Sequence, residues 1–422
     1  MHQLKKAVTA GLIGNTLEWY DFSLFGLFAP VIARQFFPSD IPFLSLLSTF
    51  AVFAVGFLVR PIGAILFGEI GDRSGRRAAL LLSIVLMAVP TLCMGLLPTY
   101  GQAGIAASIA LVFLRMLQGL SIGGEYAGSV SYVVEHAPAG RRGLVGSTAF
   151  VGCKLGAFLG TAVAAAVTCS ITSEEVELWG WRIPFLLGIV IALPAFFLRR
   201  SIAESPVYVE AAEGCTDKIS PLKETLRYHA SKVLLFAGII FPMTVWIYTL
   251  MVYMPTYLHT FVDFSLALSF LLNLFPLLIL ALTTLLGGWL SDKLGRRKVI
   301  FWPLLVMTLI GYPAMQIFAS GNIMMIVIVY NSMAALLGIL QAPVAGALVE
   351  NFPTRIRYTA VSLSYNISTS IFGGCTPLIA TALIAYLGNP LAPAYWAVFS
   401  GVVGLAALSQ LKETYRMEAL AS

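Results

Sequence analysis

Residues 68–77 read GEIGDRSGRR, and residues 288–297 read GWLSDKLGRR. The two segments share a glycine at the first position, an aspartate at the fifth and a Gly-Arg-Arg ending. A second pair, residues 135–142 (EHAPAGRR) and 350–357 (ENFPTRIR), shares a leading glutamate, a proline at the fourth position and basic residues after it. Two matched motifs at nearly the same separation indicate a chain built from duplicated halves.

The composition is that of a membrane protein. Apolar residues make up 59% of the 422-residue chain and charged residues only 11%, against roughly 25% charged residues in soluble globular proteins. Most of the surface is therefore expected to face hydrocarbon. The net charge of +6 would suggest nucleic acid in a soluble protein, but here we assign it to loops on one side of a membrane, and we expect no nucleic-acid partner.

Twelve apolar segments are long enough to cross a bilayer, which takes about 20 residues each. They divide six and six around residues 199–232, the longest charged stretch of low hydrophobicity. We therefore predict an all-α membrane protein with twelve transmembrane helices in two pseudo-symmetric six-helix bundles, residues 1–200 and 232–422, joined by a cytoplasmic linker at 201–231. The predicted spans are 7–34, 43–70, 77–98, 103–135, 142–170, 182–200, 232–260, 265–291, 298–319, 322–350, 356–387 and 391–411.

Basic residues gather on one side of these predicted spans. Most of the 26 Lys and Arg residues fall in the same alternate set of loops, and the opposite loops are acidic or neutral. Cytoplasmic loops carry the excess of Lys and Arg, and the number of spans is even, so both termini are expected in the cytoplasm. We predict a multi-pass, monomeric protein of the bacterial cell inner membrane, surrounded by the lipid bilayer.

The two loop motifs resemble the conserved loop signature of the major facilitator superfamily. Three other segments are more specific: residues 14–22 (GNTLEWYDF), 60–63 (RPIG) and 115–126 (RMLQGLSIGGEY). Together they resemble the metabolite:proton symporter family, which includes proline/betaine, shikimate, citrate and 2-oxoglutarate permeases, and they are most similar to its proline/betaine branch. The resemblance covers essentially the whole chain. It implies alternating access, in which two halves rock around a substrate site near the midplane.

Ionisable residues inside the predicted spans are candidates for function, because a charge in the bilayer is costly. All of them fall in the first half: Glu18, Asp21, Arg60, Arg115, Glu125 and Lys154. Burial favours the neutral form of a carboxylic acid, and a nearby cation favours the ionised form. Ion pairs that form and break during the cycle would therefore bind and release a proton. Static ion pairs that fix helix packing are the alternative.

We expect four of these residues to carry proton coupling. The predicted pairs are a carboxylate of the first helix with Arg115, and Glu125 with Lys154 or Arg60. Asp21 and Glu125 are the predicted proton carriers, and Arg115 is the cation that tunes one of them. The proton-coupling set is Asp21, Glu125, Arg115 and Glu18.

Other polar and aromatic residues are candidates for a substrate site. Lys154 lies between Gly152 and Gly156, at a spacing that allows close helix packing, and it would attract a substrate carboxylate if it entered the cavity. Aromatic faces bind quaternary ammonium groups, although Trp and Tyr also mark membrane interfaces. The predicted substrate-binding residues are Lys154, Arg60, Trp19, Tyr20, Tyr126, Trp246, Tyr330, Asn331, Tyr365 and Asn366.

The loop motifs are expected to act as latches that hold the cytoplasmic side closed. Their aspartates can cap a helix N-terminus or pair with an arginine of a neighbouring helix. In the second motif we expect Glu135 to pair with Arg141, and Glu350 with Arg355. Positive-inside topology alone is the alternative. The predicted latch residues are Asp72, Arg76, Arg77, Glu135, Arg141, Asp292, Arg296, Arg297, Glu350 and Arg355.

The predicted function is transport. The sequence contains no nucleotide-binding loop, metal-ligand cluster or nucleophile–base set, so we expect no enzyme activity, metal or other cofactor, and a proton gradient as the driving force. We predict a proton-coupled symporter that takes up a small zwitterionic solute of the proline/betaine type. An organic acid (2-oxoglutarate, citrate or shikimate-like) is the alternative, which Lys154 favours. An effluxing antiporter or a transport-dead sensor is less favoured.

Overall fold

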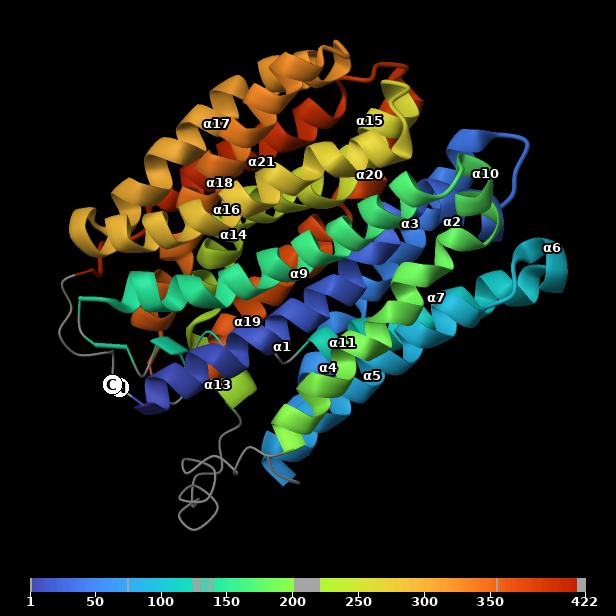
Figure 1. Ribbon diagram of the computed structural model, residues 1–422. Helices are drawn as coiled ribbons and strands as arrows, with labels where there is room; N and C mark the ends of the chain where they lie inside the picture. Colours follow the sequence, from blue (N-terminus) through green and yellow to red (C-terminus); the bar gives the residue numbers. More distant parts are fainter. Residues whose placement is uncertain are drawn as a thin grey trace.

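The protein is a bundle of long helices in its computed structural model. The structure describes residues 2–73, 76–123, 130, 133–134, 137–138, 140–200, 221–353 and 356–415, and within these ranges it leaves out the side chains of 2–11, 68–73, 76–80, 191, 195, 198–200 and 221. No strand occurs in this part of the chain. Two groups of helices pack side by side (Figure 1), one coloured blue to green and the other yellow to red.

The first group is built from residues before the predicted linker. Its long helices are apolar with few charges, as a bilayer requires. Proline at an early helical position begins α2 and α3, where its fixed φ fits and no backbone donor is lost. The elements are α1 (His2–Leu27), α2 (Ala29–Phe36), α3 (Pro42–Leu58), α4 (Arg60–Arg73), α5 (Arg76–Leu96), α6 (Tyr100–Ala103), α7 (Ile105–Ile122), α9 (Arg142–Ser170), α10 (Ser173–Glu175), the π-helix η1 (Val176–Gly180) and α11 (Arg182–Arg200).

The second group follows the short helix α13, which lies inside the predicted linker range. Two of its long helices are interrupted near the middle by a π-helical turn, a feature frequent at functional sites. The elements are α13 (Pro221–Tyr228), α14 (Ala230–Tyr248), η2 (Thr249–Tyr253), α15 (Met254–Phe261), α16 (Leu266–Leu294), α17 (Arg296–Ala319), α18 (Ile323–Asn351), α19 (Arg357–Ile367), η3 (Ser368–Gly373), α20 (Thr376–Leu387) and α21 (Pro393–Ser409).

The predicted spans coincide with these helices. Among the described residues, 8 helices are long and apolar enough to cross a membrane, and the bent pair Ser173–Gly180 with Arg182–Pro194 would be a ninth. The span predicted at 7–34 falls on α1 with α2. Those at 77–98 and 391–411 fall on the shorter apolar helices Leu81–Leu96 and Pro393–Ser409. The all-α, multi-span prediction is confirmed.

Small residues set the packing of α1 against α9. A Cβ atom added at Gly152 would lie 2.7 Å from the Leu12 carbonyl oxygen, and one at Gly156 would lie 2.9 Å from the Cβ of Trp19. Neither helix could approach so closely with larger side chains, as the glycine spacing predicts. The contact places Lys154, which lies between the two glycines, against the charged turn of α1.

Contacts between the two groups run along several helices. α9 lies against α16 over much of its length, α3 contacts α20, α4 contacts α19, and α1 contacts η2. We name the latch end as the end of the bundle that carries Asp292, Arg296 and Glu350. At the opposite end, Ser265 and Asn322 cap α16 and α18 by accepting hydrogen bonds from backbone N–H groups three residues on.

Candidate functional site

A buried ion pair of the first helix group lies where the two groups meet. Arg60 Nη2 stands 3.7 Å from Glu18 Oε1, and both side chains are almost fully buried. Arg60 also lies over the ring of Phe57, 5.0 Å from its centroid, and within hydrogen-bonding reach of Tyr248 on α14. The pair therefore belongs to the first group but touches the second.

Aromatic rings from both groups surround this pair. The rings of Trp19 and Tyr248 stack with centroids 6.1 Å apart, and Phe57 meets Tyr248 edge to face at 5.0 Å. Tyr365 on α19 lies close enough to Arg60 and Tyr248 to interact with them electrostatically. We call Glu18, Trp19, Arg60, Lys154, Tyr248 and Tyr365 the central cluster.

Lys154 contributes a second cation to the central cluster. Its side chain is 1% exposed, and its Nζ lies 5.3 Å from the ring centroid of Trp19. Among the described residues, no carboxylate lies within ion-pair distance of it. The central cluster thus holds two cations and one carboxylate, a surplus of positive charge that suits a carboxylate-bearing ligand.

Asp21 and Arg115 lie next to the central cluster but do not touch each other. Arg115 Cζ lies 4.5 Å from the ring centroids of both Phe22 and Phe25, and its Nη1 donates to Gln118 Oε1 at 2.7 Å. Gln118 Nε2 then donates to Thr91 Oγ1 at 2.7 Å. The Thr91 hydroxyl, which lies near Asp21, donates its own hydrogen to the Met87 carbonyl at 2.9 Å. Two polar side chains, Thr91 and Gln118, thus lie between the carboxylate and the guanidinium.

This arrangement corrects the predicted pairing of charges. We expected a carboxylate of the first helix to pair with Arg115, but Glu18 pairs with Arg60 instead. Among the described residues, no cation lies within ion-pair distance of Asp21. The Arg115 guanidinium lies over the phenylalanine rings, and it donates to Gln118 in place of a carboxylate. Glu125 and Tyr126 lie outside the described residues.

A small cavity connects the two carboxylates of α1. It has a volume of about 20 Å³ and is lined by Glu18, Asp21, Ser83 and Ser121, with apolar side chains such as Ala88 completing its wall. A site of roughly 10–15 Å³ with polar partners is enough for one water molecule. Gly188 makes room for the carboxylate beside it, because a Cβ atom there would lie 2.7 Å from Asp21 Oδ1.

Several predicted substrate-binding residues have other partners. The Tyr20 hydroxyl donates to the Pro184 carbonyl of α11 at 2.9 Å. The ring of Trp246 packs 3.1 Å from the position of a Cβ at Gly311, toward α17. The amide of Asn331 donates to Val327 of its own helix. These contacts place the three side chains in helix packing and not in the central cluster.

The two remaining predicted residues of the second group hold backbone atoms in place. The Tyr330 hydroxyl donates to the carbonyl of Leu250, at the π-helical turn η2, and lies 2.6 Å from Asn273 Oδ1. Asn366 Nδ2 donates to the Gly123 carbonyl of the first group at 3.1 Å. Tyr330 therefore supports the irregular turn of its bundle, and Asn366 links the two helix groups.

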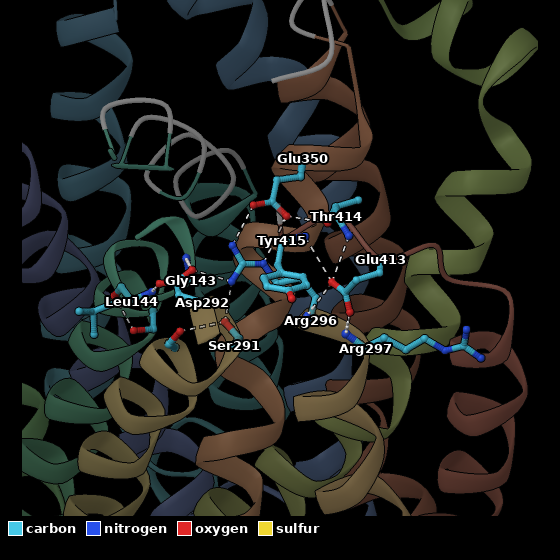
Figure 2. A network of polar contacts seen from close by, with 12 residues as sticks. Gly143, Leu144, Ser291, Asp292, Arg296, Arg297, Glu350, Glu413, Thr414 and Tyr415 are labelled. Carbon is cyan, nitrogen blue, oxygen red and sulfur yellow. Dashed lines mark hydrogen bonds and ion pairs between the residues drawn. The ribbon is translucent and has the colours of Figure 1, made fainter. Parts of the chain in front are cut away.

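At the latch end, Asp292 joins the two groups directly (Figure 2). Its carboxylate oxygens accept hydrogen bonds from the backbone N–H groups of Gly143 and Leu144, each at 2.8 Å. The acceptor lies at the N-terminus of α9, where the helix dipole favours a negative charge. Arg296 Nη1 donates to the same carboxylate at 2.6 Å, so Asp292 is held from both sides.

Arg296 extends this network to Glu350 and to the last described residues. Arg296 Nη2 lies 2.9 Å from Glu350 Oε1, where we expected Arg355, which lies outside the described residues. Glu413 accepts from the backbone N–H groups of Arg296 and Arg297 at 2.8 and 3.0 Å. Thr414 Oγ1 donates to Glu350 Oε2 at 2.6 Å. The sequence analysis missed Glu413 and Thr414, because no motif marks them.

The other predicted latch residues contribute less to the described network. Arg141 is exposed at the start of α9, and among the described residues it makes no ion pair. The side chains of Asp72, Arg76 and Arg77, and the whole of Glu135, lie outside the description. The latch network seen here is therefore that of the second motif copy.

Comparisons with known proteins agree with this architecture. The family model described as Major Facilitator Superfamily matches residues 11–363. The chain is 38% identical over 410 residues to a "Putative proline/betaine transporter" of Staphylococcus aureus (strain COL), covering 96% of this chain and 88% of that protein. It is 33% identical over 422 residues to the "Proline/betaine transporter" of Salmonella typhimurium, covering 98% and 84%.

Solved structures share the fold. The partially occluded inward-open conformation of the xylose transporter XylE from E. coli superposes with a TM-score of 0.78 at 19% identity, covering 98% of this chain and 99% of that one. A crystal structure of a D-xylose-proton symporter gives a TM-score of 0.76 at 20% identity, covering 97% and 98%. At such identities the likeness concerns the arrangement of helices alone.

Proposed function

Because the chain belongs to the Major Facilitator Superfamily, we propose that it is a proton-coupled symporter that takes up a small zwitterionic solute of the proline/betaine type by alternating access. The resemblance found in the loop motifs is confirmed by the relatives named proline/betaine transporter. Because of this family membership, the chain is a membrane transporter and not an enzyme. The solute and the coupling ion are our proposal.

The central cluster is the observation that carries the proposal. It lies where the two helix groups meet, and it is walled by Trp19 from the first and Tyr248 from the second. Arg60 and Lys154 offer positive charge to a carboxylate. The aromatic faces suit the ammonium end of a zwitterion, because a cation is attracted to the face of a ring. Both ends of a proline- or betaine-like solute thus have a partner here.

Proton coupling rests on the carboxylates of α1. The side chain of Asp21 is 4% exposed. Thr91 and Gln118 lie between it and Arg115, and among the described residues no cation contacts it. An ionisable group inside the bilayer is costly, and it is therefore a candidate for function. We assign Asp21 as the principal proton carrier, with Glu18 and Arg115 as its partners. Glu125 remains a predicted carrier.

Rocking of the two groups would expose the central cluster to one side at a time. We propose that the latch end is cytoplasmic, with both termini on that side, that the protein lies in a bacterial inner membrane, and that it acts as a monomer. The basic loops support this orientation, since Lys and Arg are retained in the cytoplasm. Asp292, bound to α9 across the interface, would then hold the cytoplasmic side closed.

Transport by purified protein in liposomes tests the proposal. An inward proton gradient should drive accumulation of labelled proline or glycine betaine, and Asp21→Asn should abolish it. Asp40→Asn is the matched control, because Asp40 is exposed in a loop. Accumulation that ignores the gradient, or that survives in Asp21→Asn, would refute the proton coupling.

A second candidate solute class is an organic acid. Lys154 favours it, because this buried cation has no described carboxylate partner. The same liposomes should therefore be tested with 2-oxoglutarate and citrate. Uptake of these acids in place of the zwitterions would move the assignment to the acid class, and solute leaving against the gradient would indicate efflux.

A further inference from the structure

Lys154 is fixed near the middle of α9, on the face that meets α1. The glycines on either side of it press α9 against α1, and the two helices run side by side in Figure 1. Asn15 Nδ2 donates to the Ala149 carbonyl at 3.0 Å. Thr16 Oγ1 lies 3.2 Å from the Gly152 carbonyl oxygen. These contacts keep α9 from rotating, so Lys154 stays beside α1.

The ammonium group of Lys154 cannot reach water along its own helix. Lys154 lies twelve residues after Arg142, the first residue of α9, and sixteen before Ser170, the last. At 1.5 Å per residue, these separations are about 18 and 24 Å, far longer than a lysine side chain. Lysines near helix ends extend to the membrane surface, but Lys154 is too distant from both ends. Its charge therefore has to be matched inside the protein.

The contacts of Lys154 do not match that charge. The other cation of the central cluster, Arg60, already faces the Glu18 carboxylate at 3.7 Å. Lys154 Nζ instead lies over the ring of Trp19, 5.3 Å from its centroid, and among the described residues no carboxylate lies within ion-pair distance of it. The attraction of a ring face is weaker than the cost of taking an ammonium group out of water. Lys154 therefore needs an anion from outside the described part of the chain.

The place that Lys154 takes over Trp19 is one that suits the cationic end of a betaine. A ring face attracts an ammonium group whether it belongs to a side chain or to a ligand. Trp19 also stacks on Tyr248, with centroids 6.1 Å apart, so this wall of the central cluster already carries a cation of the protein. A carboxylate that bound beside Lys154 would form with it the ammonium–carboxylate combination that a zwitterion carries within one molecule.

The charge of the central cluster favours a solute with one negative charge. Its described ionisable pair, Arg60 with Glu18, is balanced, and Lys154 adds one positive charge. One carboxylate brings this set to neutrality. A zwitterion leaves the positive charge in place, and a dicarboxylate replaces it with a negative one. Uncompensated charge is costly in a buried site, so a monocarboxylate is the best match.

We propose that Lys154 is a built-in ammonium group that pairs with the carboxylate of the solute, and that the protein therefore also binds small monocarboxylates that have no ammonium group of their own. This inference rests on the proposed function, because it uses the central cluster as the solute site. It extends the substrate class from zwitterions to anions of the same shape, and it leaves Arg60 paired with Glu18.

Equilibrium binding of solutes with matched shapes tests the inference. The anion 3,3-dimethylbutyrate has the shape of glycine betaine with carbon in place of the ammonium nitrogen, and cyclopentanecarboxylate has the same relation to proline. Both should bind the purified wild type at neutral pH at least as tightly as the zwitterions, because neither is repelled by Lys154. Binding is the suitable measurement, since undissociated carboxylic acids cross bilayers unaided. A wild type that binds glycine betaine but not 3,3-dimethylbutyrate would overturn the inference.

Lys154→Met replaces the ammonium group by an apolar group of similar length. Affinity for 3,3-dimethylbutyrate should fall by roughly a hundredfold or more, as expected when one partner of a buried charge pair is removed. Glycine betaine should lose less, because its own ammonium group is no longer repelled. Lys154→Arg keeps the charge and should bind both within about tenfold of the wild type. Lys293→Met is the matched control, since Lys293 lies 3.9 Å over Trp289 in an exposed pair, and it should bind as the wild type. Unchanged selectivity in Lys154→Met would refute the inference.

Two further ligands test the role of charge. The amide 3,3-dimethylbutanamide keeps the shape of the anion and lacks its charge, so it should bind weakly to the wild type and equally weakly to Lys154→Met. Equal losses for the acid and the amide would show that the variant had only changed packing, and would overturn the inference. Tighter binding of 2-oxoglutarate than of the monocarboxylates would overturn it as well.

Thermal unfolding gives a second measurement that does not depend on a ligand. In the ligand-free protein, Lys154→Met removes a buried charge that has no described carboxylate partner, so the variant should unfold at the same temperature as the wild type or higher. Adding 3,3-dimethylbutyrate should raise the unfolding temperature of the wild type and of Lys293→Met, but not that of Lys154→Met. A lower unfolding temperature of ligand-free Lys154→Met would show that the ammonium group has its partner within the protein, and would overturn the inference.

These results separate the inference from the proposed function. A wild type that accumulates glycine betaine under a proton gradient and binds no monocarboxylate would refute the inference and leave the proposed function intact. A wild type that binds 3,3-dimethylbutyrate through Lys154 but accumulates neither proline nor glycine betaine would support the inference and refute the zwitterion assignment. A wild type that binds none of these solutes would refute both.

Discussion

Asp292→Asn should weaken the closure of the latch end. The aspartate accepts two backbone N–H groups of α9, from Gly143 and Leu144, each at 2.8 Å. Asparagine is uncharged, and its side chain offers one acceptor oxygen, so at least one of these N–H groups loses its partner. A hydrogen bond to a charged group contributes about 1.5–3 kcal/mol. The open state should therefore gain a factor of roughly 10–150 in population, at tenfold per 1.4 kcal/mol.

Amide hydrogen exchange reads this directly, because the donors are backbone N–H groups. Peptides that hold residues 143 and 144 in their interior should exchange faster in Asp292→Asn, by a factor in the range above. Asp40→Asn, which removes an exposed carboxylate from a loop, should leave these peptides unchanged. Equal protection of residues 143–144 in Asp292→Asn and the wild type would show that the cap does not hold the two groups together.

Two further predictions concern packing. Gly156→Leu should reduce the free energy of unfolding by about 1–3 kcal/mol, seen as a lower thermal unfolding temperature, because its Cβ and side chain would force α1 away from α9. Gly101→Leu, whose added Cβ would meet the Thr99 hydroxyl at an ordinary contact distance of 3.9 Å, should unfold like the wild type, and equal losses in both would contradict the packing argument. Tyr330→Phe should reduce the free energy of unfolding by about 1–3 kcal/mol in the same assay, because the Leu250 carbonyl at the π-helical turn loses its side-chain donor. An unchanged unfolding temperature would show that this carbonyl finds another partner.

The spans and the two halves follow from the sequence because the bilayer imposes them locally. A crossing needs a run of about 20 apolar residues, and that run is visible without any knowledge of neighbouring helices. The duplicated loop motifs at 68–77 and 288–297 mark the same position in each half. The rarity of charge inside the spans is equally local. It singled out Glu18, Asp21 and Arg60 before any contact was known.

The partners of those charges were decided by the tertiary structure. Which face of α1 meets which helix depends on the rotation and axial offset of helices that are far apart in the chain, and hydropathy carries no record of either. Glu18 therefore meets Arg60, whereas Asp21 reaches Arg115 only through Thr91 and Gln118.

The same reason explains the residues that the sequence did not mark. Thr91 and Gln118 are ordinary polar residues in apolar helices, and their role comes from lying between two charges. Glu413 matters because it lies at the N-terminus of α17, where the first backbone N–H groups have no acceptor within the helix and donate to its carboxylate. The sequence determined which groups are costly to bury, and the packing of the helices determined how each of them is satisfied.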